Sequence, residues 1–218
     1  MSGAEAVVVL GLLGNIITII QAVEQVSKAF TSSTGLPKNF KETAAKLPFI
    51  SVLLGDAKRY IEAINDSRKA ALKPIFERCQ SRAVHLQQLF TSVEREDGDT
   101  KFDRYWKAAR TIGKGGRVED LMRGILEDLQ LMLTRFPEIT TTQSKEELAK
   151  AIDEVSKMEP SLPAFFDEGG SFYHSGSGAQ NNNLAGGVQN INTGTGNQNN
   201  GPGYQYIGTN HIGTPAPK

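Results

Sequence analysis

Gly113-Lys114-Gly115-Gly116 is the short motif in this chain that comes nearest to a phosphate-binding loop. In nucleotide-binding proteins, the backbone amides of such a loop and a lysine cradle phosphate oxygens. The motif lacks the spacing Gly-x-x-x-x-Gly-Lys-Ser/Thr, and no strand-like segment precedes it. We therefore interpret it as a turn between two helices that uses the freedom of glycine at positive φ.

The remaining reactive side chains do not form a catalytic constellation. Cys79 lies on an apolar helical stripe, whereas a nucleophilic thiol needs an electropositive, partly open setting. None of the histidines has a metal-binding neighbour at useful spacing, and we expect His85 to be partly exposed. The acidic pairs lie on strongly periodic helices, where a solvated face is expected; they are Glu127-Asp128 and Glu146-Glu147. The sequence predicts a protein that is not an enzyme and has no cofactor or metal.

The charge balance argues against a nucleic-acid partner. The chain has 24 Lys and Arg residues against 24 Asp and Glu residues, so no net field selects a polyanion. Phe102, Tyr105 and Trp106 stand next to basic residues, but their helical spacing favours a core face with a solvated rim over an RNA surface. A single cysteine gives no disulfide framework, which predicts a cytoplasmic protein.

Apolar residues recur at helical spacing along the first part of the chain, and no segment alternates as a strand does. We predict an all-α bundle over residues 1–163. Pro48 should kink the second helix, because proline removes a backbone hydrogen bond. Ser144 and Glu147 form a capping box that opens the last helix. The expected helices cover residues 4–30, 37–64, 72–93, 101–110, 118–133 and 144–158, with a turn at 65–67.

The first of these helices is unusually apolar. The run from Ala6 to Val23 approaches the ~18 residues at which a membrane span becomes a candidate, although Asn15 and Gln21 interrupt it. We expect it to be the central helix of the bundle. A sharper hypothesis is that it leaves the bundle for a bilayer. The residues assigned to that membrane activity are Val8, Leu12, Leu13, Ile16, Ile17 and Ile20.

The chemistry of the chain changes completely in the tail, residues 164–218. From Gly169 to Pro217 there is no charged side chain, and a Gly-x-Gln unit recurs with glutamines at 180, 189, 198 and 205. Such a tract has too few apolar groups to build a core. Stacked copies can instead form cross-β, in which each glutamine bonds its copies above and below. The tail is therefore either a flexible tether or an amyloid-forming segment.

Specific tail residues are assigned to amyloid assembly. The glutamine ladders would be formed by Gln180, Gln189, Gln198 and Gln205. The densest apolar cluster of the tail is the expected nucleation point, and it consists of Tyr204, Tyr206 and Ile207. This interpretation predicts that the protein associates with itself through the tail.

Three segments resemble the SesA domain, a fungal N-terminal domain found in front of NACHT and other P-loop NTPases. They are residues 33–40, residues 72–79 and, most specifically, residues 113–130 (GKGGRVEDLMRGILEDLQ). The resemblance spans about residues 8–133 and implies an all-helical domain of NOD-like receptor signalling without catalytic residues. The tail is similar, more loosely, to the Gly/Asn/Gln-rich amyloid signalling motifs that accompany such domains.

The resemblance implies two functions. The first is an effector of fungal programmed cell death or heterokaryon incompatibility. A NOD-like receptor with a matching amyloid motif would template the tail, and the first helix would then associate with a membrane. The second is a non-enzymatic adaptor whose tail is a flexible tether. No NTPase motif follows the helical region, so we expect a stand-alone effector or adaptor rather than a receptor.

Overall fold

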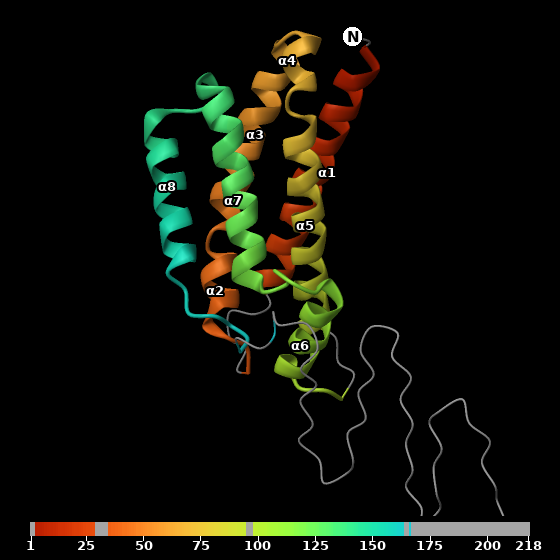
Figure 1. Cartoon of the computed structure of the whole chain (residues 1–218), viewed down its shortest axis with the longest axis vertical. Helices are drawn as coiled ribbons and strands as arrows, with labels where there is room; N and C mark the ends of the chain where they lie inside the picture. Colours follow the sequence, from red (N-terminus) through yellow and green to blue (C-terminus); the bar gives the residue numbers. More distant parts are fainter. Residues whose placement is uncertain (1–2, 29–34, 95–97, 164–165, 167–218) are drawn as a thin grey trace, which may run out of the picture. The chain divides into compact units, whose positions relative to one another are not determined.

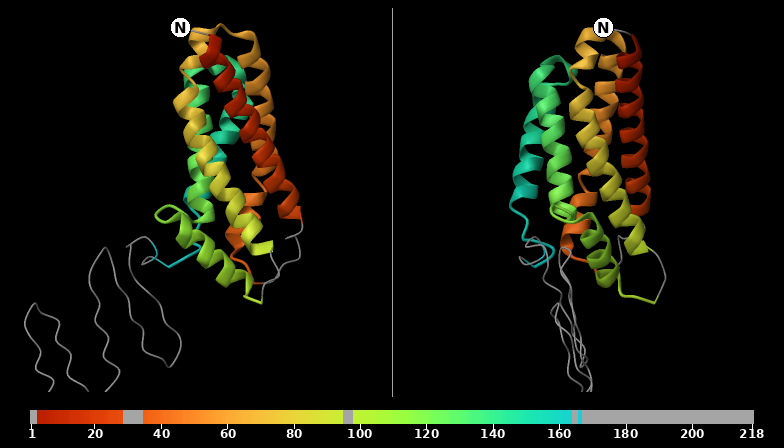
Figure 2. Two further views of the ribbon diagram at one scale, coloured as in Figure 1. Left: turned by 90° about the vertical axis from the view of Figure 1, so that its right-hand side faces the viewer. Right: turned by 45° about the vertical axis from the view of Figure 1, so that its right-hand side comes forward.

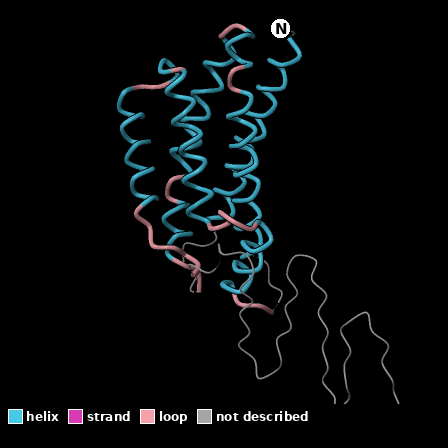
Figure 3. Tube along the Cα trace, viewed as in Figure 1, coloured by secondary structure: helices cyan, strands magenta, loops and turns pink. Residues whose placement is uncertain are grey.

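The structure is a computed structural model that describes residues 3–28, 35–94, 98–163 and 166 (Figure 1). These residues belong to a compact unit that covers residues 1–169. The regular secondary structure within the described ranges is entirely helical, without a strand (Figure 3). The all-α prediction is therefore confirmed.

The described helices follow one another with short connections. In chain order they are α1 (Gly3–Lys28), α2 (Lys38–Ala44), α3 (Leu47–Ala63), α4 (Asp66–Ala70), α5 (Lys73–Glu94), α6 (Lys101–Ile112), α7 (Val118–Arg135), the 3-10 helix η1 (Pro137–Ile139) and α8 (Thr142–Ser156).

The long helices α1, α3, α5, α7 and α8 lie side by side in a bundle, with α2 and α6 at one end and α4 at the other (Figures 1 and 2). The apolar stripes read from the sequence face inward, because the bundle buries them between neighbouring helices. Helix α7 packs against α5 and α8, and most of its side chains are buried. It is thus the helix that the bundle encloses most fully.

Helix α1 differs from the central helix that the sequence analysis expects. It packs mainly against α3 and α5, with smaller contacts to α4 and α2, and stands at the edge of the bundle (Figure 2). Only 33% of its most apolar stretch is buried. A helix with few charges is not driven to the centre when a single apolar face can be covered by two neighbours, and the rest of its surface stays in contact with water.

The second predicted helix is two helices rather than one kinked helix. Helix α2 ends at Ala44, and α3 begins at Leu47 with Pro48 in its first turn. A proline in that position costs no hydrogen bond, because the first amides of a helix have no partner within it. Pro48 therefore starts α3, and the predicted kink is wrong.

Two smaller boundaries also differ from the prediction. The predicted turn at 65–67 contains the start of the short helix α4, which Asn65 caps by accepting a hydrogen bond from the Arg68 amide at 3.0 Å. The cap of α8 is Thr141 rather than Ser144, and its hydroxyl accepts from the Ser144 amide at 3.2 Å. Ser144 and Glu147 therefore lie inside α8 and do not open it.

Candidate functional site: the first helix and the polar contacts of the bundle

Helix α1 is held in the bundle by a single apolar stripe at three-and-four spacing. The buried members of this stripe are Ala6, Val9, Leu13, Ile16, Ile20 and Val23. The polar side chains of α1 bond within the helix, as when the Thr18 hydroxyl donates to the Gly14 carbonyl at 3.0 Å and the Ser27 hydroxyl donates to the Glu24 carbonyl at 2.8 Å. Apolar packing against α3 and α5 therefore dominates the attachment of this helix.

The six residues predicted to be membrane-active are divided between three environments. Leu13, Ile16 and Ile20 are fully buried in the core. Leu12 and Ile17 are half-buried and pack against that core, and Val8 is exposed at 46%. These residues do not form one free apolar surface, so the whole helix would have to leave the bundle before they could contact lipid together.

The solvent-facing side of α1 is small and polar over its middle and end. Its exposed members between residues 11 and 25 are Gly11, Asn15, Thr18, Gln21 and Gln25, and none of them carries a charge; the exposed Lys28 ends the helix. The first two turns instead expose Val7 (71%) and Val8. The structure thus shows why a helix this apolar is compatible with water: its few polar residues are on the outer face.

The other predicted site residues lie outside the described ranges. They are Gln180, Gln189, Gln198, Gln205, Tyr204, Tyr206 and Ile207. Their assignment to amyloid assembly remains a prediction from the sequence.

A buried carboxylate joins α5 to α7, in a place where the sequence predicts a solvated face. Asp128 on α7 is only 3% exposed. Arg78 donates to its Oδ1 from Nε at 3.1 Å and from Nη2 at 2.9 Å, and Arg82 donates to its Oδ2. Two guanidinium groups therefore pair with one carboxylate, and their charge-assisted hydrogen bonds offset the free-energy cost of burying its charge.

Glu119 on α7 is a second acidic residue that the bundle buries. It is 6% exposed, and its Oε1 accepts a hydrogen bond from the Ser161 amide at 2.8 Å. Periodicity alone misses both carboxylates because their partners come from other elements. The sequence does contain one indication of a close contact near Asp128: Gly124, four residues earlier, is a glycine inside a strongly periodic helix, where a glycine usually has a packing reason.

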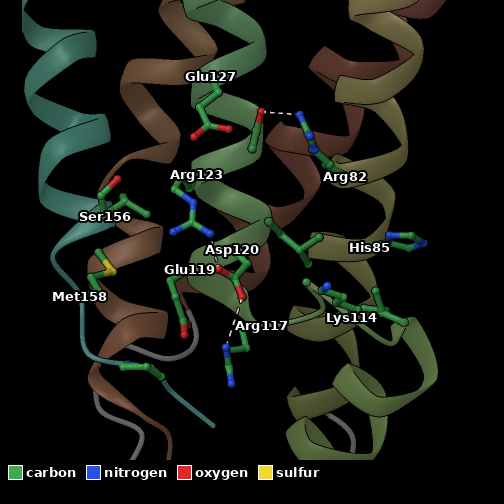
Figure 4. A pocket seen from close by; sticks show the side chains of 16 residues that line it. Arg82, His85, Lys114, Arg117, Glu119, Asp120, Arg123, Glu127, Ser156 and Met158 are labelled. Carbon is green, nitrogen blue, oxygen red and sulfur yellow. Dashed lines mark hydrogen bonds and ion pairs between the residues drawn. The ribbon is translucent and has the colours of Figure 1, made fainter. Parts of the chain in front are cut away.

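A pocket of about 750 Å³ lies between α5, the start of α7 and the end of α8 (Figure 4). Basic and acidic side chains are present in nearly equal number in its lining. Arg123 donates to Oδ1 of Asp120 at 2.6 Å, and Arg117 forms an ion pair with Oδ2 of the same carboxylate at 3.7 Å. The basic side chains are Arg82, Lys114, Arg117 and Arg123, and the acidic ones are Glu119, Asp120 and Glu127. A lining of this kind selects neither an anion nor a cation strongly.

The glycine motif lies at the edge of this pocket and forms the turn between α6 and α7, as predicted. Gly113 and Gly115 have φ of 86° and 76°. A Cβ at Gly116 would come 2.6 Å from the Ala109 carbonyl oxygen, so the turn needs glycine there. Glu119 and Asp120 occupy the first turn of α7, where a phosphate would sit, and their negative charges disfavour it.

The environments of Cys79 and His85 do not favour chemical reactivity or metal binding. Burial raises the pKa of the Cys79 thiol to about 12, and the nearby Asp128 carboxylate acts in the same direction, so the thiolate nucleophile is disfavoured. His85 is half-buried, as expected. Within the described ranges, no group of three or more His, Cys, Asp or Glu residues is arranged to hold a metal ion.

A polar cluster fastens the turn before α8 to α3 and α4. Tyr60 and Arg68 both donate to Oε1 of Glu138, and the Arg68 guanidinium lies 5.1 Å from the centre of the Phe136 ring. The hydrogen bond from Tyr60, together with Arg68, lowers the pKa of Glu138 to about 2. The cluster is on the surface and holds η1 in place.

By length and composition, the helix from Glu5 to Lys28 is the one described segment that could cross a membrane. Comparison with curated proteins and with solved structures found no match. A family model described as SesA, the N-terminal domain on NACHT NTPases and P-loop NTPases, matches residues 13–132. The match covers more than half of the 218 residues and includes α1 beyond its first turns, the Arg78–Asp128–Arg82 network and most of α7; the chain therefore belongs to the SesA family.

Proposed function

We propose that this protein is a membrane-acting effector of NOD-like receptor signalling, activated by amyloid templating of its tail. Its family places it among the N-terminal signalling domains of NACHT NTPases. The observation that supports membrane action most directly is α1, an uncharged stretch from Ala6 to Val23 that stands at the edge of the bundle. At ~1.5 Å per residue this stretch is about 27 Å long, close to the ~30 Å of a bilayer core.

Simple magnitudes indicate that α1 stays in the bundle at rest. Five fully buried Val, Leu and Ile side chains hold it there, and each contributes about 1.5–3 kcal/mol, so the total is on the order of 10 kcal/mol. A helix that leaves the bundle first exposes these side chains to water, and this stabilisation is lost before any contact with lipid restores it. Release therefore needs a further driving force.

Assembly of the tail supplies that force in this proposal. Stacking of tails raises the local concentration of the helical domains, and each domain then faces many copies of itself at the membrane. A NOD-like receptor with a matching Gly-x-Gln tract would start the stacking. The functional outcome is programmed cell death by membrane permeabilisation.

Vesicle leakage tests this proposal. Full-length protein is added to dye-loaded vesicles, alone and together with preformed fibres of the 169–218 peptide. The proposal expects leakage only when the fibres are present, because they convert the resting protein. Equal leakage with and without fibres would contradict the role of the tail, and an absence of leakage in both would contradict the effector function.

An adaptor is the second candidate, and the outer face of α1 favours it. Asn15, Thr18 and Gln21 give this face the polarity of an ordinary domain surface. An adaptor would keep α1 packed, bind a partner domain through the bundle and use the tail as a tether. The leakage measurement separates the two, because an adaptor leaves the vesicles intact under both conditions.

A further inference from the structure

The stretch Glu159–Pro163, here called the strap, is the last part of the domain before the tail. It leaves the end of α8 and runs toward α2 without regular secondary structure (Figure 1). Its Glu159, Pro160 and Pro163 are exposed, whereas Leu162 is only 1% exposed. The strap therefore lies on the surface of the domain and inserts one apolar side chain, that of Leu162, into the core.

Polar side chains from separate elements bind the main chain of the strap. Asn39 of α2 donates from Nδ2 to the Glu159 carbonyl at 2.9 Å, and Arg117 donates from Nη2 to the Pro163 carbonyl at 3.0 Å. The Ser161 amide donates to Oε1 of Glu119. The residues that bind the strap are themselves buried: Asn39 is 2% exposed, Arg117 8% and Glu119 6%.

Tyr105 of α6 binds the centre of the strap. Its hydroxyl oxygen accepts a hydrogen bond from the Val118 amide at 3.2 Å, in the first turn of α7, and its hydroxyl pairs with Oγ of Ser161. Because the amide already donates to it, the Tyr105 hydroxyl is free to donate to Ser161. Tyr105 is itself fully buried.

Together these contacts have the pattern of peptide recognition. Buried polar groups are costly in a helical bundle unless each one has a partner. Here Asn39, Arg117 and Glu119 each bond a backbone group of one extended segment, and Leu162 of that segment is buried in the hydrophobic core. Main-chain bonds with one buried side chain are how proteins bind extended peptides.

We propose that Asn39, Tyr105, Arg117 and Glu119 form a peptide-binding groove that takes the strap of a second copy of this chain as well as its own. The segment seated in the groove shows which sequence it recognises, and every copy carries that sequence. Exchange of straps links two bundles without any new surface. It does not depend on amyloid formation by the tail, although gathering of tails promotes it by mass action.

A strap variant of the full chain opens the groove for the test. Ser161→Pro removes both the amide bonded to Glu119 and the hydroxyl bonded to Tyr105. The probe is a synthetic peptide of residues 157–166, which stands for the strap of a second copy. Trp106 is the only tryptophan and lies 5.8 Å from the ring of Phe166, so its fluorescence reports docking.

The expected result is that the peptide binds the Ser161→Pro chain at least tenfold more tightly than it binds the wild-type chain, whose own strap competes. The emission of Trp106 should shift when the variant strap leaves and return when the peptide binds. A peptide that itself carries Ser161→Pro should not bind, and a Ser156→Ala chain should behave as wild type. A folded Ser161→Pro chain that does not bind the wild-type peptide would overturn the proposal.

If the Ser161→Pro chain does not fold, hydrogen exchange on the wild-type chain tests whether the strap can leave the groove while the bundle stays folded. A strap that dissociates from an intact bundle lets the Ser161 amide exchange at least tenfold faster than the amide of Ile125 in the middle of α7. Equal exchange rates at the two positions would mean that the strap leaves only when the whole domain unfolds, and this would overturn the proposal.

Discussion

Arg82 lies directly against Gly124, on the face of α7 that packs on α5. Its Nη1 donates to the Gly124 carbonyl at 2.7 Å, and a Cβ at position 124 would come within 2.6 Å of its Nε. Glycine inside a helix costs about 1 kcal/mol relative to alanine. The space left by the missing side chain is used here to bring a guanidinium onto the helix backbone and onto Asp128.

The relationship between Arg82 and Gly124 predicts strong coupling in a double-mutant cycle. In an Arg82→Ala background, Gly124→Ala should stabilise the domain by about 1 kcal/mol, because the helix gains propensity and nothing occupies the space. In the wild-type background the gain should disappear or change sign, since the guanidinium must shift. Urea unfolding of the four proteins measures this. Equal effects in both backgrounds would show that the two residues are independent.

Asp128 should be the charged residue whose loss is most costly to the domain. Asp128→Ala removes a buried carboxylate and three hydrogen bonds, but the two guanidinium groups that remain are 47% and 34% exposed and stay partly hydrated, so the expected cost is about 1–3 kcal/mol. Glu127→Ala is the matched control, because the neighbouring carboxylate is exposed and should change stability by less than about 0.5 kcal/mol. Similar unfolding midpoints for the two variants would contradict the network.

Periodicity predicts the parts of this fold that depend on neighbours along the chain. The stripes of α5 and α7 and the buried positions of Leu13 and Cys79 follow from three-and-four spacing, and the structure confirms them. The partners of Asp128 and Glu119 could not be predicted, because they come from residues far away in the sequence. Pro48 is ambiguous from the sequence, since a proline can kink one helix or start another.

The outer position of α1 could not be predicted for a different reason. Composition reports how apolar a helix is, whereas its place in the bundle depends on how many neighbours cover it. The polar residues Asn15, Thr18 and Gln21 all fall on one face, and this spacing was the available signal that one side meets water. The assignment of the six α1 residues to a membrane contact remains a prediction; they are Val8, Leu12, Leu13, Ile16, Ile17 and Ile20.

Glu138 should give the domain a pH dependence below neutrality. Its pKa is lowered from 4.5 to about 2, first by the hydrogen bond from Tyr60. A group with a depressed folded-state pKa contributes stability that is present above its unfolded pKa and is lost as the pH falls through its folded pKa. Wild type should therefore exceed Glu138→Gln in thermal midpoint at pH 6, and the difference should shrink between pH 4.5 and 2. A difference that is constant over this range would contradict the assignment.

The tail should assemble through its glutamines. Gln205→Pro removes a ladder donor in the expected nucleus and fixes φ, so a 169–218 peptide with this change should form no fibres. Gln189→Lys should slow assembly, since stacking places like charges one above another. Thioflavin fluorescence and fibre diffraction measure both effects. A wild-type peptide that remains monomeric at high micromolar concentration, even when seeded, would leave the tail as a tether.

A charge on the outer face of α1 separates membrane action from folding. Asn15 is exposed in the bundle and lies in the middle of the apolar run, so Asn15→Lys should leave the thermal midpoint unchanged. In a bilayer the same lysine costs about 2.5–3.5 kcal/mol at the centre of a helix. Leu13→Asp does not separate the two effects, because Leu13 is fully buried.

The most direct measurement is fibre-triggered vesicle leakage by full-length wild type, Asn15→Lys and Gln25→Lys. Gln25 is also exposed on α1 but lies beyond the apolar run, so it is the matched control. We predict that Asn15→Lys lowers leakage at least tenfold with its fold intact, whereas Gln25→Lys leaks like wild type. Equal leakage by all three folded proteins would contradict insertion of α1.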